Sequence, residues 1–293
     1  MEQVSDLITR LNIPLRHPPL KEEDLKSATY ILIRHAYSEY NHIAQEIETK
    51  YGEHSEEKKA LKGNPEMYDP GLHAIGKMQA ESNSEHVNPI NFKVVFVSPM
   101  QRTLQTCIHL FKNHPNKKDI RFVVLPIIRE VLETSNDIAL DIDVIVEKYA
   151  PGQPITEGIH FDFSMNMLHG QPNLWQIFTL ANLQKQKDLI LSLKVDDSGK
   201  ANHQEVILSR LVLHEPRYEN HKDLYARAKV IKQFLREYIT ANPLNHEKQE
   251  KYGIISHSRI IATMTATGHR EEDDELIDYV WFQNCEMRPY HSY

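Results

Sequence analysis

Charged or nucleophilic side chains follow each of four short apolar runs in the sequence. They are Arg34 and His35 after the first run, Ser98 and Arg102 after the second, Arg129 and Glu130 after the third, and Ser256 and His257 after the fourth. In open α/β sheets, ligands bind beyond the carboxyl ends of the strands. If the four runs are strands of one sheet, these side chains converge on one rim and form an anion site.

The residue types in this set suit phosphoryl transfer. Arg34 and Arg102 each present a planar fork of donors that matches phosphate oxygens. A neutral imidazole such as that of His35 can attack phosphorus and form a covalent phosphohistidine. A carboxylic acid such as Glu130 can protonate the leaving oxygen and later activate water. The set therefore indicates phosphoryl transfer through a histidine, with His257 as a second imidazole in the site.

Each of these residues also has an ordinary structural explanation. A single histidine after a strand is more often structural than catalytic. An arginine such as Arg102 is usually a surface residue of a helix, and a glutamate such as Glu130 is usually solvated. One anion site explains such groups at all four strand ends better than four unrelated roles do.

Hydrophobic periodicity predicts the elements that must position these residues. Short apolar runs predict strands at 30–33, 94–97, 122–125, 253–255 and 280–282. Helical spacing predicts helices at 36–50, from Ser98 onward, at 221–240 and from Arg259 onward. Ser98 would be the N-cap of its helix, with Pro99 at the first helical position. Alternating strands and helices predict an α/β fold of three layers, a mostly parallel sheet flanked by helices.

The length of 293 residues fits one domain that spans 1–293 and carries an insertion. Residues 1–28 are polar and proline-containing, and we expect an N-terminal arm there. Residues 151–215 mix Pro, Gly, Asn and Met with short apolar groups, which we interpret as an inserted, mostly helical lid. His160, His169 and Arg217 are possible substrate contacts in and beside it.

Composition narrows the class of protein. The net charge of −7 gives no bulk attraction to nucleic acid or to an anionic membrane, so we expect a small phosphorylated substrate as the partner. Cys107 and Cys285 are too few for a disulfide framework or a zinc site. With no signal peptide and no apolar run that spans a bilayer, we expect a cytoplasmic protein. The acidic run 271–275 is predicted to be a solvated loop between a helix and a strand.

Five segments in order resemble the histidine phosphatase (phosphoglycerate mutase-like) superfamily, and within it the phosphatase branch. They are IRHAYSEYN at 33–41, DPGLHAIGKMQA at 69–80, VSPMQRTLQT at 97–106, LPIIREV at 125–131 and IISHS at 254–258. The resemblance implies a phosphoglycerate mutase-like fold and a histidine phosphatase, a phosphoric monoester hydrolase that needs no cofactor and no metal. Members of the family commonly carry substrate-determining insertions where 151–215 lies.

The resemblance also implies a role for each matched residue. His35 is the expected nucleophile, Glu130 the proton donor, and Arg34, Arg102 and His257 the groups that hold the phosphoryl oxygens. We further expect substrate contacts from Asn41, Tyr37 and Ser258.

The sequence departs from the family pattern at several positions. Ala36 and Ser258 stand where glycine is usual, Tyr37 where many members have Glu, and His73 where threonine is usual. Glu133 is an alternative acid, because it would share a face with Glu130 if that segment were helical.

Three functions fit these motifs. The first is hydrolysis of a small phosphomonoester. The second is a phosphoglycerate mutase, although such enzymes carry Arg-His-Tyr-Gly where residues 131–134 read Val-Leu-Glu-Thr. The third is a non-catalytic phosphate-binding module of the same fold. Neither the physiological substrate nor the oligomeric state follows from the sequence.

Overall fold

A six-stranded sheet forms the centre of the computed structural model, which describes residues 4–166, 171–197, 199–212 and 218–291. The strand order is β4-β3-β2-β5-β1-β8. The bounds are β1 Tyr30–Arg34, β2 Phe92–Val97, β3 Arg121–Val124, β4 Phe161–Asp162, β5 Lys251–Ser256 and β8 Met287–Tyr290. The first five strands in this order run parallel, and β8 runs antiparallel beside β1.

The register of the sheet brings four strand ends level with one another. Ile255 of β5 lies opposite both Ile33 of β1 and Val97 of β2, and Val97 in turn lies opposite Val124 of β3. The residues that follow these four positions therefore leave the sheet along one edge. This is the rim that the sequence predicts.

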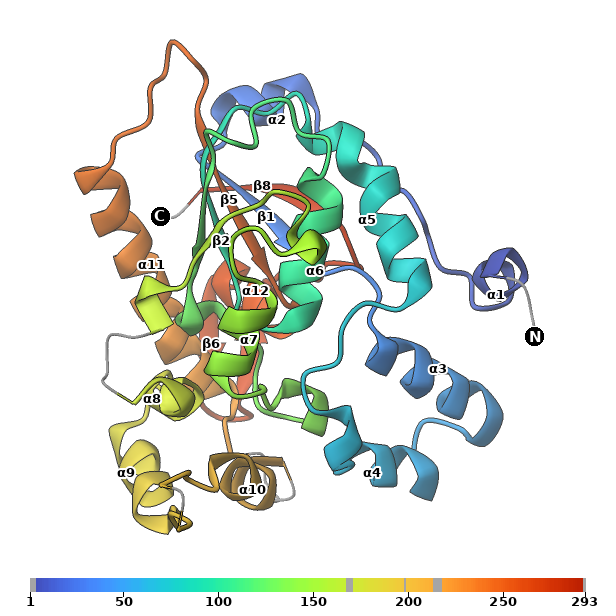
Figure 1. Ribbon diagram of the computed structural model, residues 1–293, viewed down its shortest axis with the longest axis vertical. Helices are drawn as coiled ribbons and strands as arrows, with labels where there is room; N and C mark the ends of the chain where they lie inside the picture. Colours follow the sequence, from blue (N-terminus) through green and yellow to red (C-terminus); the bar gives the residue numbers. More distant parts are fainter. Residues whose placement is uncertain (1–3, 167–170, 198, 213–217, 292–293) are drawn as a thin grey trace.

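Helices cover both faces of the sheet (Figure 1). Their bounds are α1 Val4–Arg10, α2 Glu22–Ser27, α3 Glu39–Tyr51, α4 Glu56–Lys62, α5 Ala74–Val87, α6 Gln101–Phe111, α7 Ile142–Lys148, α8 Trp175–Phe178, α9 Leu183–Ser192, α10 His203–Ile207, α11 His221–Ala241 and α12 Ser258–Thr265. A hairpin of β6 Gly268–Arg270 and β7 Glu275–Ile277 follows α12. The predicted α/β fold with a mostly parallel, helix-flanked sheet is confirmed.

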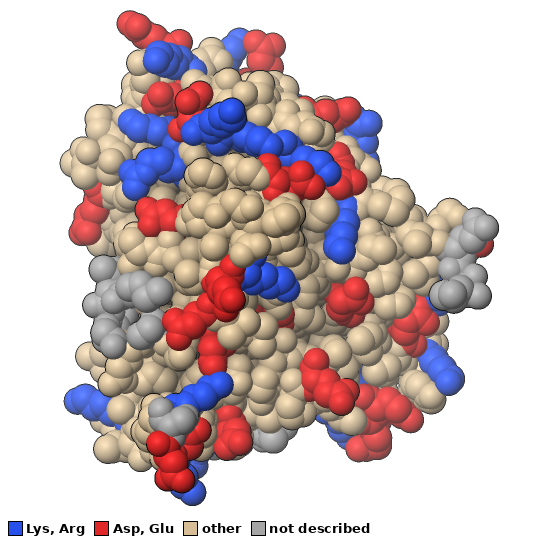
Figure 2. Space-filling view, viewed as in Figure 1, with Lys and Arg blue, Asp and Glu red and all other residues tan. Residues whose placement is uncertain are grey.

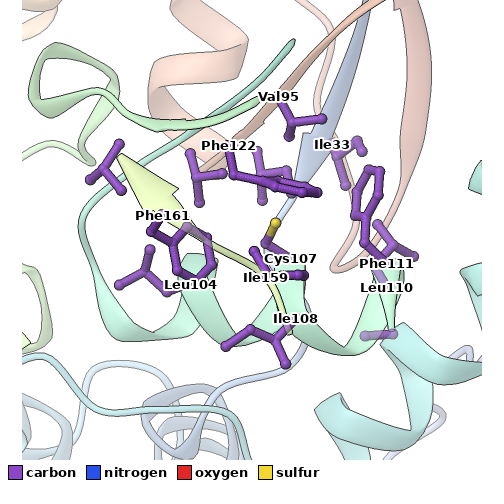
Figure 3. Close-up of a cluster of buried hydrophobic side chains, with 14 of the residues drawn as sticks. Ile33, Val95, Leu104, Cys107, Ile108, Leu110, Phe111, Phe122, Ile159 and Phe161 are labelled. Atoms are coloured by element: carbon purple, nitrogen blue, oxygen red, sulfur yellow. The ribbon is translucent and has the colours of Figure 1, made fainter. Parts of the chain in front are cut away.

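Two hydrophobic clusters, one on each face, hold the layers together. Alternate side chains of a strand point to opposite faces, so Ile31 and Ile33 join the cluster of α5, α6 and α7, while Tyr30 and Leu32 join that of α11 and α12. Figure 3 shows the first cluster, in which Cys107 of α6 lies beside Phe122 of β3. Burying one such apolar side chain contributes about 1.5–3 kcal/mol.

The segment 151–215 contains short helices and also one edge strand of the sheet. β4 pairs with β3, whereas α8, α9 and α10 pack in a third hydrophobic cluster. Leu132 and Ile138, which follow Glu130 in the chain, belong to that same cluster. The insertion is therefore joined to the segment after Glu130 by apolar packing.

The predicted strand at 280–282 is wrong, because this segment has no strand pairing and the last strand is β8. The side chain of Phe282 is buried, but its carbonyl accepts a hydrogen bond from Arg34. The N–H of Val280 donates to the Thr265 hydroxyl at 3.0 Å. The backbone groups that a strand would need thus bond to side chains instead.

The predicted helix start at Ser98 and Pro99 is also wrong. The helix α6 begins at Gln101, after Met100 as N-cap. The N–H of Ser98 still bonds to the carbonyl of Ile255, as in a sheet. The cap is supplied from elsewhere in the chain, since the Asp69 carboxylate accepts the Gln101 N–H at 2.8 Å.

The charged side chains of both signs are interspersed on the face shown in Figure 2. This agrees with the modest net charge of −7. Among the described helices, none is long and apolar enough to cross a membrane. The acidic run 271–275 is predicted to join a helix to a strand, but it forms the turn of the β6–β7 hairpin and the first residue of β7.

Candidate active site

The side chains of the two histidines after β1 and β5 lie next to each other at the rim. The ring centroids of His35 and His257 are 5.2 Å apart. Arg102 reaches His257 from α6, with Nε 3.2 Å from Nδ1. All three side chains are almost fully buried. Residues separated by up to 222 positions (257 − 35) thus form one cluster of nitrogen donors and acceptors.

The hydrogen bond of His35 fixes which ring nitrogen can attack. Its Nδ1 lies 2.8 Å from the carbonyl oxygen of Ala36. A carbonyl can only accept, so Nδ1 carries the proton and Nε2 carries the lone pair. Burial, and then the charges of Arg102 and Arg34, lower the pKa of His35 well below its usual value. His35 is therefore a neutral imidazole with a free nucleophilic nitrogen.

The second histidine has the opposite tautomer. The Arg102 Nε–H can only donate, so Nδ1 of His257 is the acceptor and the proton lies on Nε2. Nε2 donates this hydrogen to the Ser98 hydroxyl oxygen, which lies 2.8 Å from the nitrogen. Burial, followed by the charge of Arg102, lowers the pKa of His257 well below its usual value. His257 is thus a neutral imidazole beside the lone pair of His35, and its one N–H is bonded to Ser98 in this structure.

Arg102 is held by Asn136 and Asp137, which no sequence pattern links to the site. Its Nη1 donates to the carbonyl of Asn136 at 2.7 Å, and its Nη2 donates to the Asp137 carboxylate at 2.8 Å. The other oxygen of Asp137 accepts the Thr134 N–H at 3.1 Å. Burial raises the pKa of Asp137 to about 7, against the opposing effect of Arg102. No sequence signal marks Asp137, because only the folded chain brings it to Arg102.

Arg34 retains an unsatisfied donor in the site. Its Nη1 donates to the carbonyl of Phe282 at 2.7 Å, but its buried Nε–H has no hydrogen-bond partner among the described residues. Burial lowers the pKa of Arg34 to about 10, so the side chain remains charged at neutral pH. Because an unpaired buried donor is costly, an anion that accepted from it would be favoured.

Both carboxylate oxygens of Glu130 face the start of α12. The N–H groups of Val131 and Ile260 donate to Oε1 at 2.9 and 3.2 Å. The Ser258 hydroxyl and the Arg259 N–H donate to Oε2 at 3.3 and 3.1 Å. Ser258 therefore contacts the candidate acid, and its contact with substrate stays a prediction.

Arg129, although it follows β3 at the rim, is a structural residue. Its Nη1 pairs with the buried carboxylate of Glu219 at 2.8 Å, and Arg227 approaches the same carboxylate at 3.2 Å. Burial alone would raise the pKa of Glu219, but the two arginine charges outweigh it and lower the pKa. Arg129 and Arg227 also donate to the backbone carbonyl of Glu130, which fixes that residue in place.

Glu133 occupies a more exposed position than Glu130. The segment between them is not helical, so the two side chains do not share a helix face. The carboxylate of Glu133 pairs with Arg259 Nε at 2.8 Å, at a site where both side chains are partly exposed. The geometry leaves Glu130 in the buried cluster and Glu133 at its border.

The side chain of Tyr37 is buried in a small hydrophobic cluster, and its contact with substrate stays a prediction. Its ring packs with Leu11 and Ile75, and its hydroxyl donates to Gln45 at 2.7 Å. The backbone of Tyr37 packs closely against α5 at Gly76. A Cβ on Gly76 would lie 1.9 Å from the Tyr37 carbonyl oxygen. Only glycine permits this approach.

Asn41 and His73 both cap helices. The side-chain oxygen of Asn41 accepts the Ser38 N–H at 3.1 Å in a capping box at the start of α3. Nδ1 of His73 accepts the Ile75 N–H at 3.2 Å at the start of α5. His73 is therefore the N-cap of this helix, a role that the threonine usual at this position could also fill. The Nδ2 group of Asn284 joins Asn41 to the backbone of His35.

The possible contacts in the insertion remain predictions. The side chain of His160 is exposed, and His169 and Arg217 lie outside the described residues. Among the residues described, no group of three His, Cys, Asp or Glu side chains has a metal-binding arrangement.

Comparisons with known proteins bear on the first part of the chain. Residues 30–131 match the model of the histidine phosphatase superfamily (branch 1), a segment that contains Arg34, His35, Arg102 and Glu130. No match was found among curated protein sequences. One similar solved structure is that of the ecdysone phosphate phosphatase, EPPase, from Bombix mori in complex with tungstate. It is 13% identical, with 88% of this chain and 86% of that chain covered and a TM-score of 0.40.

Proposed function

We propose that this chain, which belongs to the histidine phosphatase superfamily through its residues 30–131, hydrolyses small phosphomonoesters by way of a phosphohistidine at His35. The observation that carries the proposal is the pair of opposite histidine tautomers. His35 presents a lone pair on Nε2, whereas His257 presents a hydrogen on Nε2. One ring can attack phosphorus, and the other can donate to a phosphoryl oxygen that replaces the Ser98 hydroxyl as the acceptor.

In the first step, Nε2 of His35 attacks phosphorus and the bond from phosphorus to the ester oxygen breaks. Arg34, Arg102 and His257 donate to the phosphoryl oxygens, which neutralises charge on the transferring group. Glu130 gives its proton to the leaving oxygen, so an alcohol departs. The Nδ1–H bond to the Ala36 carbonyl holds the ring of His35 in place throughout.

In the second step, water attacks phosphorus and the bond to Nε2 breaks. The Glu130 carboxylate takes a proton from this water, which releases inorganic phosphate and restores the acid. In this scheme two arginine side chains supply the positive charge. We therefore propose that the reaction does not depend on a metal ion.

The position of residues 131 and 132 favours hydrolysis over a mutase reaction. Val131 and Leu132 are buried, and Leu132 packs in the cluster of α8, α9 and α10. The polar Arg-His-Tyr-Gly segment of mutases is thus replaced by side chains that face a core. A non-catalytic phosphate-binding module would have the same buried cluster of histidine and arginine side chains, and only a measurement of turnover distinguishes it from an enzyme.

We also propose that the insertion 151–215 acts as a lid on this site. The support is Gln176 of α8, which donates to the carbonyl of Asp137 at 2.7 Å and accepts the Ala139 N–H at 2.8 Å. Asp137 in turn holds Arg102. The insertion is therefore one hydrogen-bonded residue away from the group that would bind phosphate.

The test is release of inorganic phosphate from a panel of phosphorylated metabolites and p-nitrophenyl phosphate, with a chelator present. His35→Ala is the control, because it removes the proposed nucleophile. The proposal expects release that persists in chelator and disappears in the variant. Phosphate binding without turnover by the folded wild-type protein would instead support the binding module.

A further inference from the structure

A pocket of about 180 Å³ opens next to the candidate acid. Its lining includes Leu224, Arg259, Thr263, Leu276, Tyr279 and Trp281. These residues come from α11, α12, the β6–β7 hairpin and the segment that follows the hairpin. An engineered apolar cavity of about 150 Å³ is large enough to bind benzene, so this pocket has room for one ring.

Two lining residues join the pocket to the proposed catalytic groups. The N–H of Arg259 donates to the Glu130 carboxylate at 3.1 Å. On the other side, the guanidinium of Arg34 lies 5.9 Å from the centroid of the Trp281 ring. The pocket therefore adjoins both the group proposed to bind the phosphoryl oxygens and the group proposed to protonate the leaving oxygen.

The direction of the reaction determines what this pocket would contain. The nucleophile and the leaving oxygen lie on opposite sides of the transferring phosphoryl group. The acid must be within hydrogen-bond reach of the leaving oxygen. The rest of the leaving group then extends past Glu130, along α12, where the pocket lies.

The walls of the pocket favour an aromatic group. The side chains of Tyr279 and Trp281 are 46% and 48% exposed, so each ring presents surface that the protein does not cover. Leu224 and Leu276 add apolar surface, His221 and Glu275 add polar groups, and the guanidinium of Arg259, which pairs with Glu133, lies at the border. Aromatic pairs add about 0.5–1.5 kcal/mol beyond burial, and a cation near a ring adds more.

The hairpin wall is fixed rather than loose. Asp274, in the turn of the hairpin, accepts the N–H groups of His221 and Lys222 at 3.0 and 2.9 Å. His269 of β6 lies 2.8 Å from the same carboxylate. These bonds tie the hairpin to the first turn of α11, so the pocket exists before any substrate binds.

We propose that this pocket is the subsite for the leaving group and selects phosphomonoesters with an aromatic ring close to the ester oxygen. The inference rests on the proposed phosphatase function. Benzyl phosphate and n-butyl phosphate test it, because both release a primary alcohol and differ mainly in the ring. Their ratio of kcat/KM therefore reports on ring recognition and not on the acidity of the leaving group.

The variant Tyr279→Ala removes a ring that the proposed mechanism does not use. The ratio of kcat/KM for benzyl over n-butyl phosphate should fall about 3- to 10-fold, the effect of losing one ring contact. Tyr279→Phe keeps the ring and should keep the wild-type ratio. Tyr51→Ala, which removes a tyrosine 48% exposed on α3, is the matched control and should change neither rate.

An unchanged ratio in Tyr279→Ala would overturn the subsite, as would an equal loss with both substrates. Trp281→Ala supplies a second measurement, in which the ratio should fall again although Arg34 is also disturbed. If wild-type protein hydrolysed neither of these esters nor any compound of the metabolite panel, the proposed function itself would fail. That result differs from hydrolysis of both esters without preference, which would contradict the subsite alone.

Discussion

His35 and His257 are both histidines, but their hydrogen-bond partners fix opposite tautomers. A carbonyl accepts from Nδ1 of His35, whereas an arginine donates to Nδ1 of His257. The sequence predicts both histidines at the rim, since each follows a strand. It could not predict their tautomers, because the partner Arg102 is 155 residues away from His257.

Substrates with different leaving groups distinguish whether Glu130 or Glu133 is the proton donor. Glu130→Gln removes the proposed proton donor, so hydrolysis of an alkyl phosphate should slow about 100-fold or more. Hydrolysis of p-nitrophenyl phosphate should slow much less, because its leaving group needs little protonation. Glu133→Gln is the matched control and should slow both esters little. Steady-state rates with the two esters check this, and a selective loss in Glu133→Gln would transfer the role to Glu133.

The neutral state of His35 predicts a pH dependence of stability. Its pKa in the folded protein is lowered from 6.5, so below pH 6.5 the unfolded chain takes up a proton that the folded protein does not. Stability from this residue is present above pH 6.5 and is lost as the pH falls. Between pH 7.5 and 5.5 the loss is on the order of 1 kcal/mol.

Urea unfolding of wild type and His35→Asn at both pH values measures the contribution of His35 to the free energy of unfolding. The free energy of unfolding should fall less in the variant, by on the order of 1 kcal/mol, since asparagine does not titrate. The comparison is needed because Asp69 and Asp137 act in the other direction. Burial raises the pKa of each to about 7, so their contribution is lost as the pH rises. If the free energy of unfolding fell equally in both proteins, His35 would have the same pKa in the folded and unfolded states.

At the scale of elements, periodicity predicts the strands β1, β2, β3 and β5 and the helix α11 within a few residues of their bounds. These elements are buried on one or both faces, so their apolar pattern is strong. The errors occur where a distant group replaces a local one. Asp69 caps α6 in place of Ser98, and Thr265 and Arg34 take the backbone bonds of 280–282.

The lack of a side chain at Gly76 allows α5 to pack closely against the loop after β1. In Gly76→Ala the new Cβ would lie 1.9 Å from the Tyr37 carbonyl oxygen, so the helix must move away from the backbone next to His35. We expect a loss of about 1–3 kcal/mol in the free energy of unfolding, typical of overpacking. Lys77→Ala, on the exposed side of the same helix, should cost little. Thermal and urea unfolding of both variants test this, and equal stabilities would contradict the close contact.

At the scale of the whole molecule, the parallel sheet assembles the site from four strand ends. The rule on carboxyl ends therefore predicts Arg34, His35, Glu130 and His257 together, because the register places them on one edge. What surrounds them was not predictable. Asp137, Gln176 and Trp281 reach the site from segments without regular periodicity, through contacts that depend on the complete fold.

Gln176 tests whether the insertion influences phosphate binding. Gln176→Ala leaves the Asp137 carbonyl and the Ala139 N–H without their partner, which should cost about 1–3 kcal/mol of stability. Because Asp137 holds Arg102, inhibition by inorganic phosphate should also weaken several-fold. Gln184→Ala, an exposed residue of α9, should change neither property. Lower stability with unchanged phosphate inhibition would limit the contact of Gln176 to a structural role.

The central claim is that His35 carries the phosphoryl group, and trapping that group tests it most directly. The measurement is rapid quench of wild-type protein with a hydrolysed phosphomonoester, followed by mass spectrometry of peptides under conditions that preserve phosphohistidine. We predict one phosphoryl group on His35, formed and lost at rates compatible with turnover, and none in His35→Ala. Turnover without a label on His35, or with the label on His257, would contradict the account.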